Sequence, residues 1–388
     1  MEKSYYFSIK LRGNFMKKLK IFFTANVLWD IYIFRYGVIK ALIEDGHEVV
    51  AIAPNDERID FPKDLGIAHI SIKLSKRGIN PFRDLSLSNQ LRRIYKKEKP
   101  DIIFHYTIKP NIYGSLMARA LGIPSVAILT GLGYSFIENG IVSKIAKVLY
   151  KISLNMSKEV WVLNEDDKQE LLLNKIVKEK KIFILPGEGV NVEKFSPIER
   201  VNNTKKDKTI FLMVARAFYD KGFREYVEAA RRIKEKNKNI EFWFLGALGG
   251  NSKNGINEEV MKNLENEGVI KYLGHRKDVE RVIGEADCIV LPSYREGISK
   301  VLMEAASMEK PLIASNVTGC KELIDDKKNG LLVQVKSVVD LIEKIEEFLE
   351  LSLLERKLMG KNGREKMLKE FDEKIIIDIY RRKICSLV

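Results

Sequence analysis

The amino-acid sequence predicts an α/β protein with two domains, each built on a parallel sheet. Short apolar runs such as residues 288–291 are continuous rather than alternating, which is typical of strands buried on both faces. These runs alternate with helical patterns, and the joints between them are short and contain Gly or Pro, as in βαβ units. The chain of 388 residues is long for one hydrophobic core and fits two domains.

The first half of the chain shows this alternation throughout. Its apolar runs predict strands at 19–25, 47–53, 67–72, 102–105, 125–129, 159–163 and 181–185. Helical spacing predicts helices at 31–45, 85–97, 111–121 and 139–157. Gly46 and Gly122 follow two of these helices and fit their C-terminal ends, and Pro100 and Pro124 stand just before strands.

The second half repeats the pattern. Its apolar runs predict strands at 209–214, 241–245, 269–273, 288–291 and 311–314. Helices are predicted at 223–236, from about 299 onward, and at 373–386. The periodicity is interrupted between 195 and 208, where we place the link. We therefore expect an extension at 1–15, domains at 16–200 and 201–370, and a terminal helix at 371–388.

Composition limits the possible functions. The formal net charge is +14, with the excess mainly in the first 200 residues, which suggests an anionic partner, although a generally lysine-rich composition would give the same charge. No nucleic-acid-binding motif accompanies the charge. No apolar stretch is long enough to span a membrane, and residues 1–15 lack a signal-peptide core, so we expect a cytoplasmic protein with a dispensable extension. Three cysteines and four histidines form no metal-binding pattern.

The stretch 292–304, PSYREGISKVLME, follows the apolar run 288–291 and leads into a helix. If the helix begins near Ser299, Glu296 and Glu304 can both face a ligand at its N-terminal end. The amides of Gly297 to Lys300 suit a diphosphate, and the carboxylates suit hydroxyl groups. A sugar nucleotide carries both kinds of group. The simpler alternative is one Glu that favours the helix dipole and another on a solvated face.

A second loop places two cations after a strand. Arg216 and Lys221 follow the apolar run 210–213 and precede the helix at 223–236. Fixed cations at the carboxyl end of a strand can neutralise a diphosphate as the bond to it breaks. The alternative is a chance Arg and Lys in a surface loop of a basic chain.

Two further stretches, 185–195 and 319–333, complete a pattern that resembles glycosyltransferase family 4. These are retaining, nucleotide-sugar-dependent enzymes of the GT-B fold, in which two Rossmann-like domains with parallel sheets face a central cleft. The resemblance runs from about Lys17 to the C-terminus. The segment 130–136, TGLGYSF, is similar to a subgroup that builds bacterial surface polysaccharides and lipid-linked oligosaccharides. Within it, the chain resembles transferases that add N-acetylgalactosamine to undecaprenyl-diphosphate-linked diacetylbacillosamine.

The resemblance implies a hexosyltransferase that uses a UDP-sugar, needs no metal or cofactor, and binds the acceptor on the first domain and the donor on the second. It implies catalytic roles for Arg216, Lys221 and Glu296. It implies donor contacts from Gly297, Ile298, Ser299, Lys300, Val301, Glu304, His275 and Arg276. It implies acceptor or sugar contacts from Asn26, His105, Thr130, Gly131 and Gly133. The family's terminal helix crosses back to the first domain, as we expect here for 371–388.

Several alternatives stay open. Relatives carry glycines after the first strand, where this chain has Asn26 and Trp29, so we expect one of these to replace backbone contacts. His105 matches the family's sugar-site His, but a His at a strand end is more often structural.

The chain could also be a lipopolysaccharide or capsule glycosyltransferase using another UDP-sugar, a nucleotide-sugar epimerase, or a non-catalytic basic binding module.

The predicted helix at 139–157 has the features of an interfacial helix. Apolar residues recur at helical spacing at 141, 145, 148, 149 and 152, and lysines stand on neighbouring faces at 144, 147 and 151. We therefore expect peripheral binding to the anionic inner face of the bacterial inner membrane. The simpler interpretation is that the apolar stripe packs on the sheet.

Overall fold

The computed structural model describes residues 17–56, 65–74, 80–132, 141–198, 208–250 and 252–388. By its contacts the chain divides into unit 1, which comprises Met1–Val126, Met156–Lys158 and Ile384–Val388, and unit 2, which comprises Ala127–Asn155 and Glu159–Lys383. These bounds differ from the predicted domain boundaries, which stay a prediction. The predicted extension at 1–15 and most of the predicted link lie outside the described residues.

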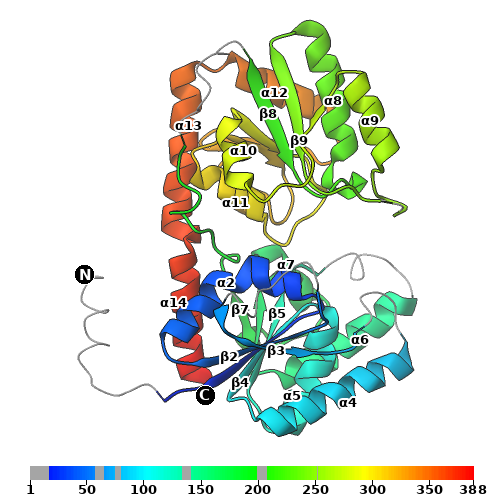
Figure 1. Ribbon diagram of the computed structural model, residues 1–388, viewed down its shortest axis with the longest axis vertical. Coiled ribbons are helices and arrows are strands. Elements are labelled where there is room, and N and C mark those ends of the chain that lie inside the picture. The colour runs from blue at the N-terminus through cyan, green and yellow to red at the C-terminus, as the bar shows by residue number, and fades with distance from the viewer. Residues whose placement is uncertain (1–16, 57–64, 75–79, 133–140, 199–207, 251) are drawn as a thin grey trace, which may run out of the picture. The chain divides into compact units, whose positions relative to one another are not determined.

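The first sheet has seven strands in the order β3-β2-β1-β4-β5-β6-β7. Figure 1 labels β2, β3, β4, β5 and β7 of this sheet. The strands are β1 (Lys20–Thr24), β2 (Glu48–Ala53), β3 (Ala68–Ser71), β4 (Ile102–Tyr106), β5 (Ser125–Leu129), β6 (Glu159–Val162) and β7 (Ile182–Ile184). β1 pairs in parallel with both β2 and β4, and its residues after Lys20 are fully buried. All seven strands predicted in this half are confirmed.

The second sheet has six strands in the order β10-β9-β8-β11-β12-β13, and every neighbouring pair is parallel. The strands are β8 (Thr209–Val214), β9 (Ile240–Leu245), β10 (Lys271–Tyr272), β11 (Cys288–Leu291), β12 (Leu312–Ser315) and β13 (Gly330–Val333). β8 and β11 begin and end at the predicted residues. Because the strands are parallel, the loops after β8 and β11 lie at the same edge of the sheet.

Helices connect the strands of the first sheet. They are α2 (Leu28–Glu44), α4 (Pro81–Glu98), α5 (Ser115–Ala120), α6 (Ile141–Met156) and α7 (Glu165–Leu173), with the π-helix η1 (Pro110–Gly114) directly before α5 and the short η3 (Glu179–Lys181) before β7. The helix predicted at 111–121 is therefore η1 followed by α5. The sequence analysis did not predict α7. Asn164 caps α7 by accepting a hydrogen bond from the Asp167 amide at 2.7 Å.

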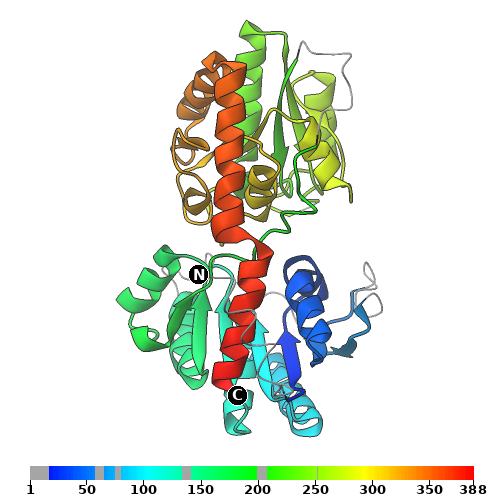
Figure 2. The same ribbon diagram turned by 90° about the vertical axis from the view of Figure 1, so that its left-hand side faces the viewer.

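The remaining helices accompany the second sheet and end the chain. They are α8 (Phe223–Lys236), α9 (Glu258–Asn266), α10 (Val279–Glu285), α11 (Lys300–Ser307), α12 (Val338–Glu350), α13 (Leu353–Lys366) and α14 (Glu373–Leu387), with the short η4 (Tyr219–Lys221), η5 (Lys321–Leu323) and η6 (Met367–Phe371). Figure 2 shows α13, η6 and α14 following one another as the orange and red end of the chain. Within unit 2, the Tyr380 ring of α14 contacts the Trp161 ring of β6, with centroids 5.0 Å apart.

α6 carries an exposed apolar stripe. Ile145, Val148 and Ile152 are 43%, 57% and 48% exposed, whereas Tyr150 and Leu154 on the opposite face are buried. The simpler interpretation, in which this stripe packs on the sheet, is therefore wrong for these three residues. Among the described residues, no helix is both long and apolar enough to cross a membrane.

Candidate active site

The loops after β8 and β11 are joined by their backbones within unit 2. The Tyr294 amide donates to the Asp220 carbonyl at 2.9 Å. Gly222 has φ = 77°, and a Cβ at this position would overlap the Pro292 carbonyl oxygen. Only glycine tolerates both the left-handed backbone and this close approach. The joined loops place Lys221 beside Glu296.

Lys221 and Glu296 form an ion pair. Lys221 Nζ lies 2.7 Å from Glu296 Oε1, and the two side chains are only 19% and 17% exposed. The structure thus brings together two residues that were predicted as catalytic. Because solvent reaches them little, each charge depends on the other, and the pair holds both side chains in one orientation.

Arg216 lies in the loop after β8, which also carries Lys221, and its side chain is exposed. It follows β8, and its guanidinium lies 5.1 Å from the centre of the Phe218 ring. An exposed guanidinium beside a loop that also carries Lys221 is available for an anionic ligand. Its predicted catalytic role stays a prediction.

The N-terminus of α11 is the predicted diphosphate site. Ser299 caps the helix, with its Oγ accepting a hydrogen bond from the Leu302 amide at 3.5 Å. The Ser299 amide itself donates to the Gly319 carbonyl at 2.8 Å, so it is engaged within the protein. The prediction that this amide binds the ligand is therefore wrong in this structure. Val301 is half-buried in the first turn of α11, and Ile298 lies against Gly187.

Glu304 is the buried carboxylate of this site. It is 9% exposed, and Lys300 one turn earlier lies 3.9 Å away. Burial raises the pKa of Glu304 to about 7, against the opposing charge of Lys300. The side chain therefore changes between neutral acid and carboxylate near physiological pH.

Two predicted sugar-site residues lie against the loop between β11 and α11, residues 292–299, which we call the donor loop because donor contacts are predicted for it. A Cβ on Gly297 would overlap the Thr130 carbonyl oxygen, and a Cβ on Gly131 would come within 3.4 Å of the Gly297 Cα. Within unit 2, Thr130 and Gly131 therefore lie next to Gly297. The space between these backbones is too small for a side chain at residue 297. Gly133 lies outside the described residues.

His275 and Arg276 are exposed after β10. The Arg276 guanidinium is bound to the Asp278 carboxylate through two contacts of 2.9 and 2.6 Å, and this partner lowers the pKa of Asp278 to about 2. The Arg276 side chain is thus engaged by Asp278, and the predicted donor contacts of His275 and Arg276 stay a prediction.

The structure favours a structural role for His105 in unit 1. The side chain is fully buried, and its ring nitrogens lie 3.0 Å from the Tyr95 hydroxyl and 3.3 Å from the Ser115 hydroxyl. Burial lowers the pKa of His105 to about 3, so the ring is neutral at physiological pH. The buried ring therefore favours the structural alternative, and the predicted sugar contact of His105 stays a prediction.

Asn26 stands at the end of β1 in unit 1. The backbone amide of Asn26 donates to the Thr107 hydroxyl at 3.2 Å. The side-chain oxygen Oδ1 of Asn26 is buried and has no hydrogen-bond partner among the described residues. Thr107 has φ = 67°, which is uncommon for a β-branched residue. A buried acceptor without a partner beside a strained residue is compatible with the predicted acceptor contact of Asn26.

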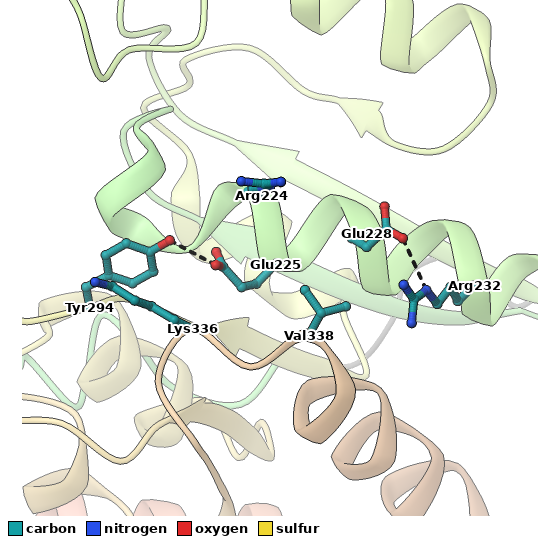
Figure 3. A pocket seen from close by; sticks show the side chains of 7 residues that line it. All are labelled: Arg224, Glu225, Glu228, Arg232, Tyr294, Lys336 and Val338. Atoms are coloured by element: carbon teal, nitrogen blue, oxygen red, sulfur yellow. Dashed lines mark hydrogen bonds and ion pairs between the residues drawn. The ribbon is translucent and has the colours of Figure 1, made fainter.

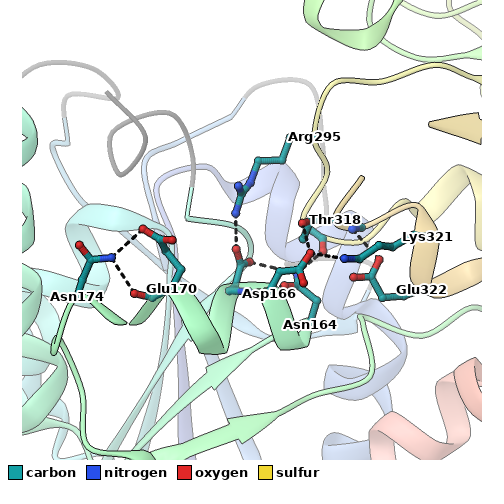
Figure 4. A network of polar contacts seen from close by, with 11 residues as sticks. Asn164, Asp166, Glu170, Asn174, Arg295, Thr318, Lys321 and Glu322 are labelled. Carbon is teal, nitrogen blue, oxygen red and sulfur yellow. Dashed lines mark hydrogen bonds and ion pairs between the residues drawn. The ribbon is translucent and has the colours of Figure 1, made fainter. Parts of the chain in front are cut away.

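Two features were missed by the sequence analysis. The first is a polar network that joins the start of α7 to the donor loop (Figure 4). It includes Asp167 and Arg295, whose charged atoms lie 2.5 Å apart. The available signal was Asn164 followed by three acidic residues, which is a typical helix start.

The second feature is a pocket of about 680 Å³ beside α8, to which none of the predicted site residues contributes. Figure 3 shows the Tyr294 hydroxyl directed at Glu225, to which it donates at 2.9 Å. The pocket is lined by Arg224, Glu225, Glu228, Arg232, Tyr294, Lys336 and Val338.

Two family models match this chain. Residues 194–366 match the family model Glycosyl transferases group 1, and residues 20–164 match Glycosyl transferase 4-like. The chain is 33% identical to the N,N'-diacetylbacillosaminyl-diphospho-undecaprenol alpha-1,3-N-acetylgalactosaminyltransferase of Campylobacter jejuni, over 93% of this chain and 97% of that one.

Another relative and a solved structure are also similar. The chain is 27% identical to the UDP-Gal:alpha-D-GlcNAc-diphosphoundecaprenol alpha-1,3-galactosyltransferase of Escherichia coli, over 76% of this chain and 78% of that one. The fold matches Anabaena Alr3699/HepE in complex with UDP and glucose with a TM-score of 0.78 and 16% identity, covering 95% of this chain and all of that one. The chain therefore belongs to glycosyltransferase family 4, the group 1 glycosyltransferases, and is a hexosyltransferase with the GT-B fold.

Proposed function

We propose that this protein transfers N-acetylgalactosamine, or a similar N-acetylhexosamine, from a UDP-sugar to an undecaprenyl-diphosphate-linked saccharide. The observation that carries the proposal is the Lys221–Glu296 ion pair at 2.7 Å, next to a helix start that also carries the buried Glu304. This arrangement offers a cation for a diphosphate and carboxylates for hydroxyl groups. The similarity to the Campylobacter jejuni transferase supports the choice of sugar and acceptor.

Each residue of the site has a defined role in this proposal. Arg216 and Lys221 neutralise the nucleoside diphosphate as the bond between its oxygen and the anomeric carbon breaks. Glu296 orients Lys221 and accepts hydrogen bonds from hydroxyls of the transferred sugar. Glu304 accepts hydrogen bonds from the ribose hydroxyls. The cations supply the charge that a metal would otherwise provide, so we propose a metal-independent reaction.

The configuration at the anomeric carbon is retained in this proposal. The acceptor hydroxyl attacks from the face that the leaving diphosphate vacates, and its proton passes to a phosphate oxygen of the leaving group. The protein then contributes positions and charges rather than a covalent nucleophile.

The test is transfer from a panel of UDP-sugars to undecaprenyl-diphosphate-linked diacetylbacillosamine, with EDTA present, reading both new glycolipid and released UDP. We expect product with UDP-N-acetylgalactosamine. Product only with UDP-galactose, as the name of the Escherichia coli relative suggests, would change the donor and keep the reaction class. Conversion of a UDP-sugar without any acceptor would replace the proposal with an epimerase. Activity that disappears with EDTA and returns with a divalent cation would contradict metal independence.

Donor affinity is expected to depend on pH through Glu304. The pKa of this group is raised to about 7, so it is largely protonated below that pH and cannot accept hydrogen bonds from both ribose hydroxyls. Binding of the donor favours the carboxylate, and affinity should therefore fall as the pH decreases. Between pH 8 and pH 6 we expect Kd for UDP-N-acetylgalactosamine to rise about tenfold.

Titration calorimetry at both pH values measures this change. The intact UDP-sugar is the suitable ligand because its diphosphate is esterified at both ends and does not titrate in this range. In Glu304→Gln the affinity should be weaker but nearly independent of pH. The same pH dependence in wild type and in this variant would exclude Glu304 as its source.

We also propose that α6 binds the anionic cytoplasmic face of the inner membrane. The exposed apolar stripe of Ile145, Val148 and Ile152 is accompanied by the exposed Lys144 and Lys151, which complement acidic headgroups. Such docking would keep the site close to a lipid-linked acceptor.

Replacing the three stripe residues with serine is expected to lower partitioning to anionic liposomes at least about tenfold, because the buried apolar area is lost. A matched control is available on α13, where Leu353, Leu354 and Leu358 are 76%, 77% and 57% exposed. Serine at these three positions should leave sedimentation with liposomes unchanged. Equal loss in both variants, or no loss in the α6 variant, would contradict docking through α6.

A further inference from the structure

The start of α7 contacts the donor loop through Asn164 and Asp167, all within unit 2. Asp167 Oδ1 lies 2.5 Å from Arg295 Nη2. The Asn164 side-chain amide donates to Asp167 Oδ2 at 3.1 Å and to the Gly297 carbonyl at 2.9 Å. Two residues of the loop, one on each side of Glu296, are thus held by the same helix start.

Asp166 holds the neighbouring loop that supports Glu296. It accepts hydrogen bonds from the Thr318 hydroxyl at 2.5 Å and from Lys321 Nζ at 2.7 Å. The Thr318 carbonyl in turn accepts from the Glu296 amide at 3.0 Å. Figure 4 shows Asp166 directed toward Thr318 and Lys321. Asp166 therefore acts on Glu296 through one intermediate residue.

Helix capping alone does not explain why the Asp167 side chain is buried. The capping oxygen is supplied by Asn164, and an acidic residue that only favours the helix dipole can stay in water, as the exposed Glu165 does. The Asp167 side chain is instead fully buried, and burial raises the pKa of this carboxyl although the charge of Arg295 opposes the change. Burying a carboxylate is unfavourable unless it is paired and hydrogen-bonded. Its position therefore indicates a function in holding Arg295.

The loop that this network holds has little freedom. A side chain on Gly297 would overlap the Thr130 carbonyl oxygen, and a Cβ on Gly319 would lie 2.6 Å from Glu296. Small displacements of the loop would therefore move Glu296 relative to Lys221, with which it pairs at 2.7 Å. Rate is sensitive to such displacements because the reacting groups must be aligned.

We infer that Asn164 and Asp167 are positioning residues, which hold Arg295 and Gly297 so that Glu296 stands correctly for the transferred sugar. This inference rests on the proposed function for the role of Glu296. Neither residue is assigned a contact with substrate. In the proposal the nucleotide is bound by Arg216, Lys221 and Glu304, whereas the network holds Arg295 and Gly297, so loss of the network should affect turnover more than donor binding.

The decisive variant is Asp167→Asn, which keeps the shape of the side chain and removes its charge. We expect kcat to fall about tenfold with KM for the donor changed less than about twofold. Glu170→Gln is the matched control, because Glu170 lies on the same helix and contacts Asn174 at 2.8 Å. Figure 4 shows this pair apart from the donor-loop contacts. The control should keep wild-type kcat.

Arg295→Gln tests the same ion pair from the other side. It leaves the fully buried Asp167 carboxylate without its cation, so this variant should have a lower melting temperature, and the double variant, which removes both charges, guards against a folding defect. The double variant Asp167→Asn/Arg295→Gln should be no slower than either single variant, because the effects of two substitutions that remove one shared contact are not additive. A double variant whose loss equals the product of the two single losses would overturn the inference.

Hydrogen exchange of the peptide that covers 294–299 provides a readout that does not need activity. Faster exchange in Asp167→Asn and unchanged exchange in Glu170→Gln supports positioning, even if wild type transfers none of the sugars tested and the proposed function fails. Unchanged exchange with wild-type kcat in Asp167→Asn overturns the inference and leaves the proposed function intact. Equal effects in both variants would also overturn it.

Discussion

Replacing Lys221 with alanine is expected to lower kcat/KM for sugar transfer about a thousandfold, which corresponds to about 4 kcal/mol of transition-state stabilisation. Two effects contribute. The leaving diphosphate loses a cation whose attraction grows as the bond breaks. Glu296, which is 17% exposed and paired with Lys221 at 2.7 Å, is left with a poorly solvated charge and no longer has a fixed orientation.

The double variant Lys221→Ala/Glu296→Gln separates these effects. Neutralising Glu296 removes the uncompensated charge, so the melting temperature should return toward wild type while kcat/KM stays low. Steady-state kinetics and thermal unfolding are measured on both variants and on Glu296→Gln alone. Single-variant kcat/KM within tenfold of wild type would exclude a catalytic role for Lys221.

Replacing Arg216 with alanine is expected to lower kcat about a hundredfold, taking about 3 kcal/mol for one lost contact with the developing charge. Arg216 is exposed and its guanidinium lies near the Phe218 ring, so its removal should leave the melting temperature unchanged. KM for the donor should change less than kcat, because the contact strengthens as the diphosphate departs.

Arg224→Ala is the matched control for charge. Arg224 is also exposed, lies near the start of α8, and lines the separate pocket beside that helix. Its removal changes the net charge by the same amount and should leave kcat unchanged. Equal losses in the two variants would indicate a general electrostatic effect on substrate encounter, and a wild-type kcat in Arg216→Ala would remove the proposed role.

The strands and most helices could be predicted from the sequence because their signals are local. β8, β11 and α8 begin and end at the predicted residues. In each case a continuous apolar run or a helical apolar period is bounded by Gly, Pro or a cluster of polar residues. Glu304 was also predicted, since its spacing from Ser299 places it on the first turns of a helix that Ser299 caps.

The helix α7 was missed because its segment, EDDKQELLL, shows little apolar periodicity. Its start signal is Asn164 with three acidic residues after it, and this signal is polar rather than apolar. His105 was assigned to the sugar site because its motif position suggested it. The motif gives no information on burial, and the structure encloses the ring between Tyr95 and Ser115.

By itself the sequence determined the two parallel sheets, the loops that carry Arg216, Lys221 and Glu296, and the family to which they point. Tertiary structure alone decided that Lys221 pairs with Glu296, that the Ser299 amide is occupied by Gly319, and that Asp167 reaches Arg295. The physical reason is distance along the chain. Strand and helix patterns repeat within a few residues, whereas an ion pair between residues 167 and 295 depends on how distant segments pack.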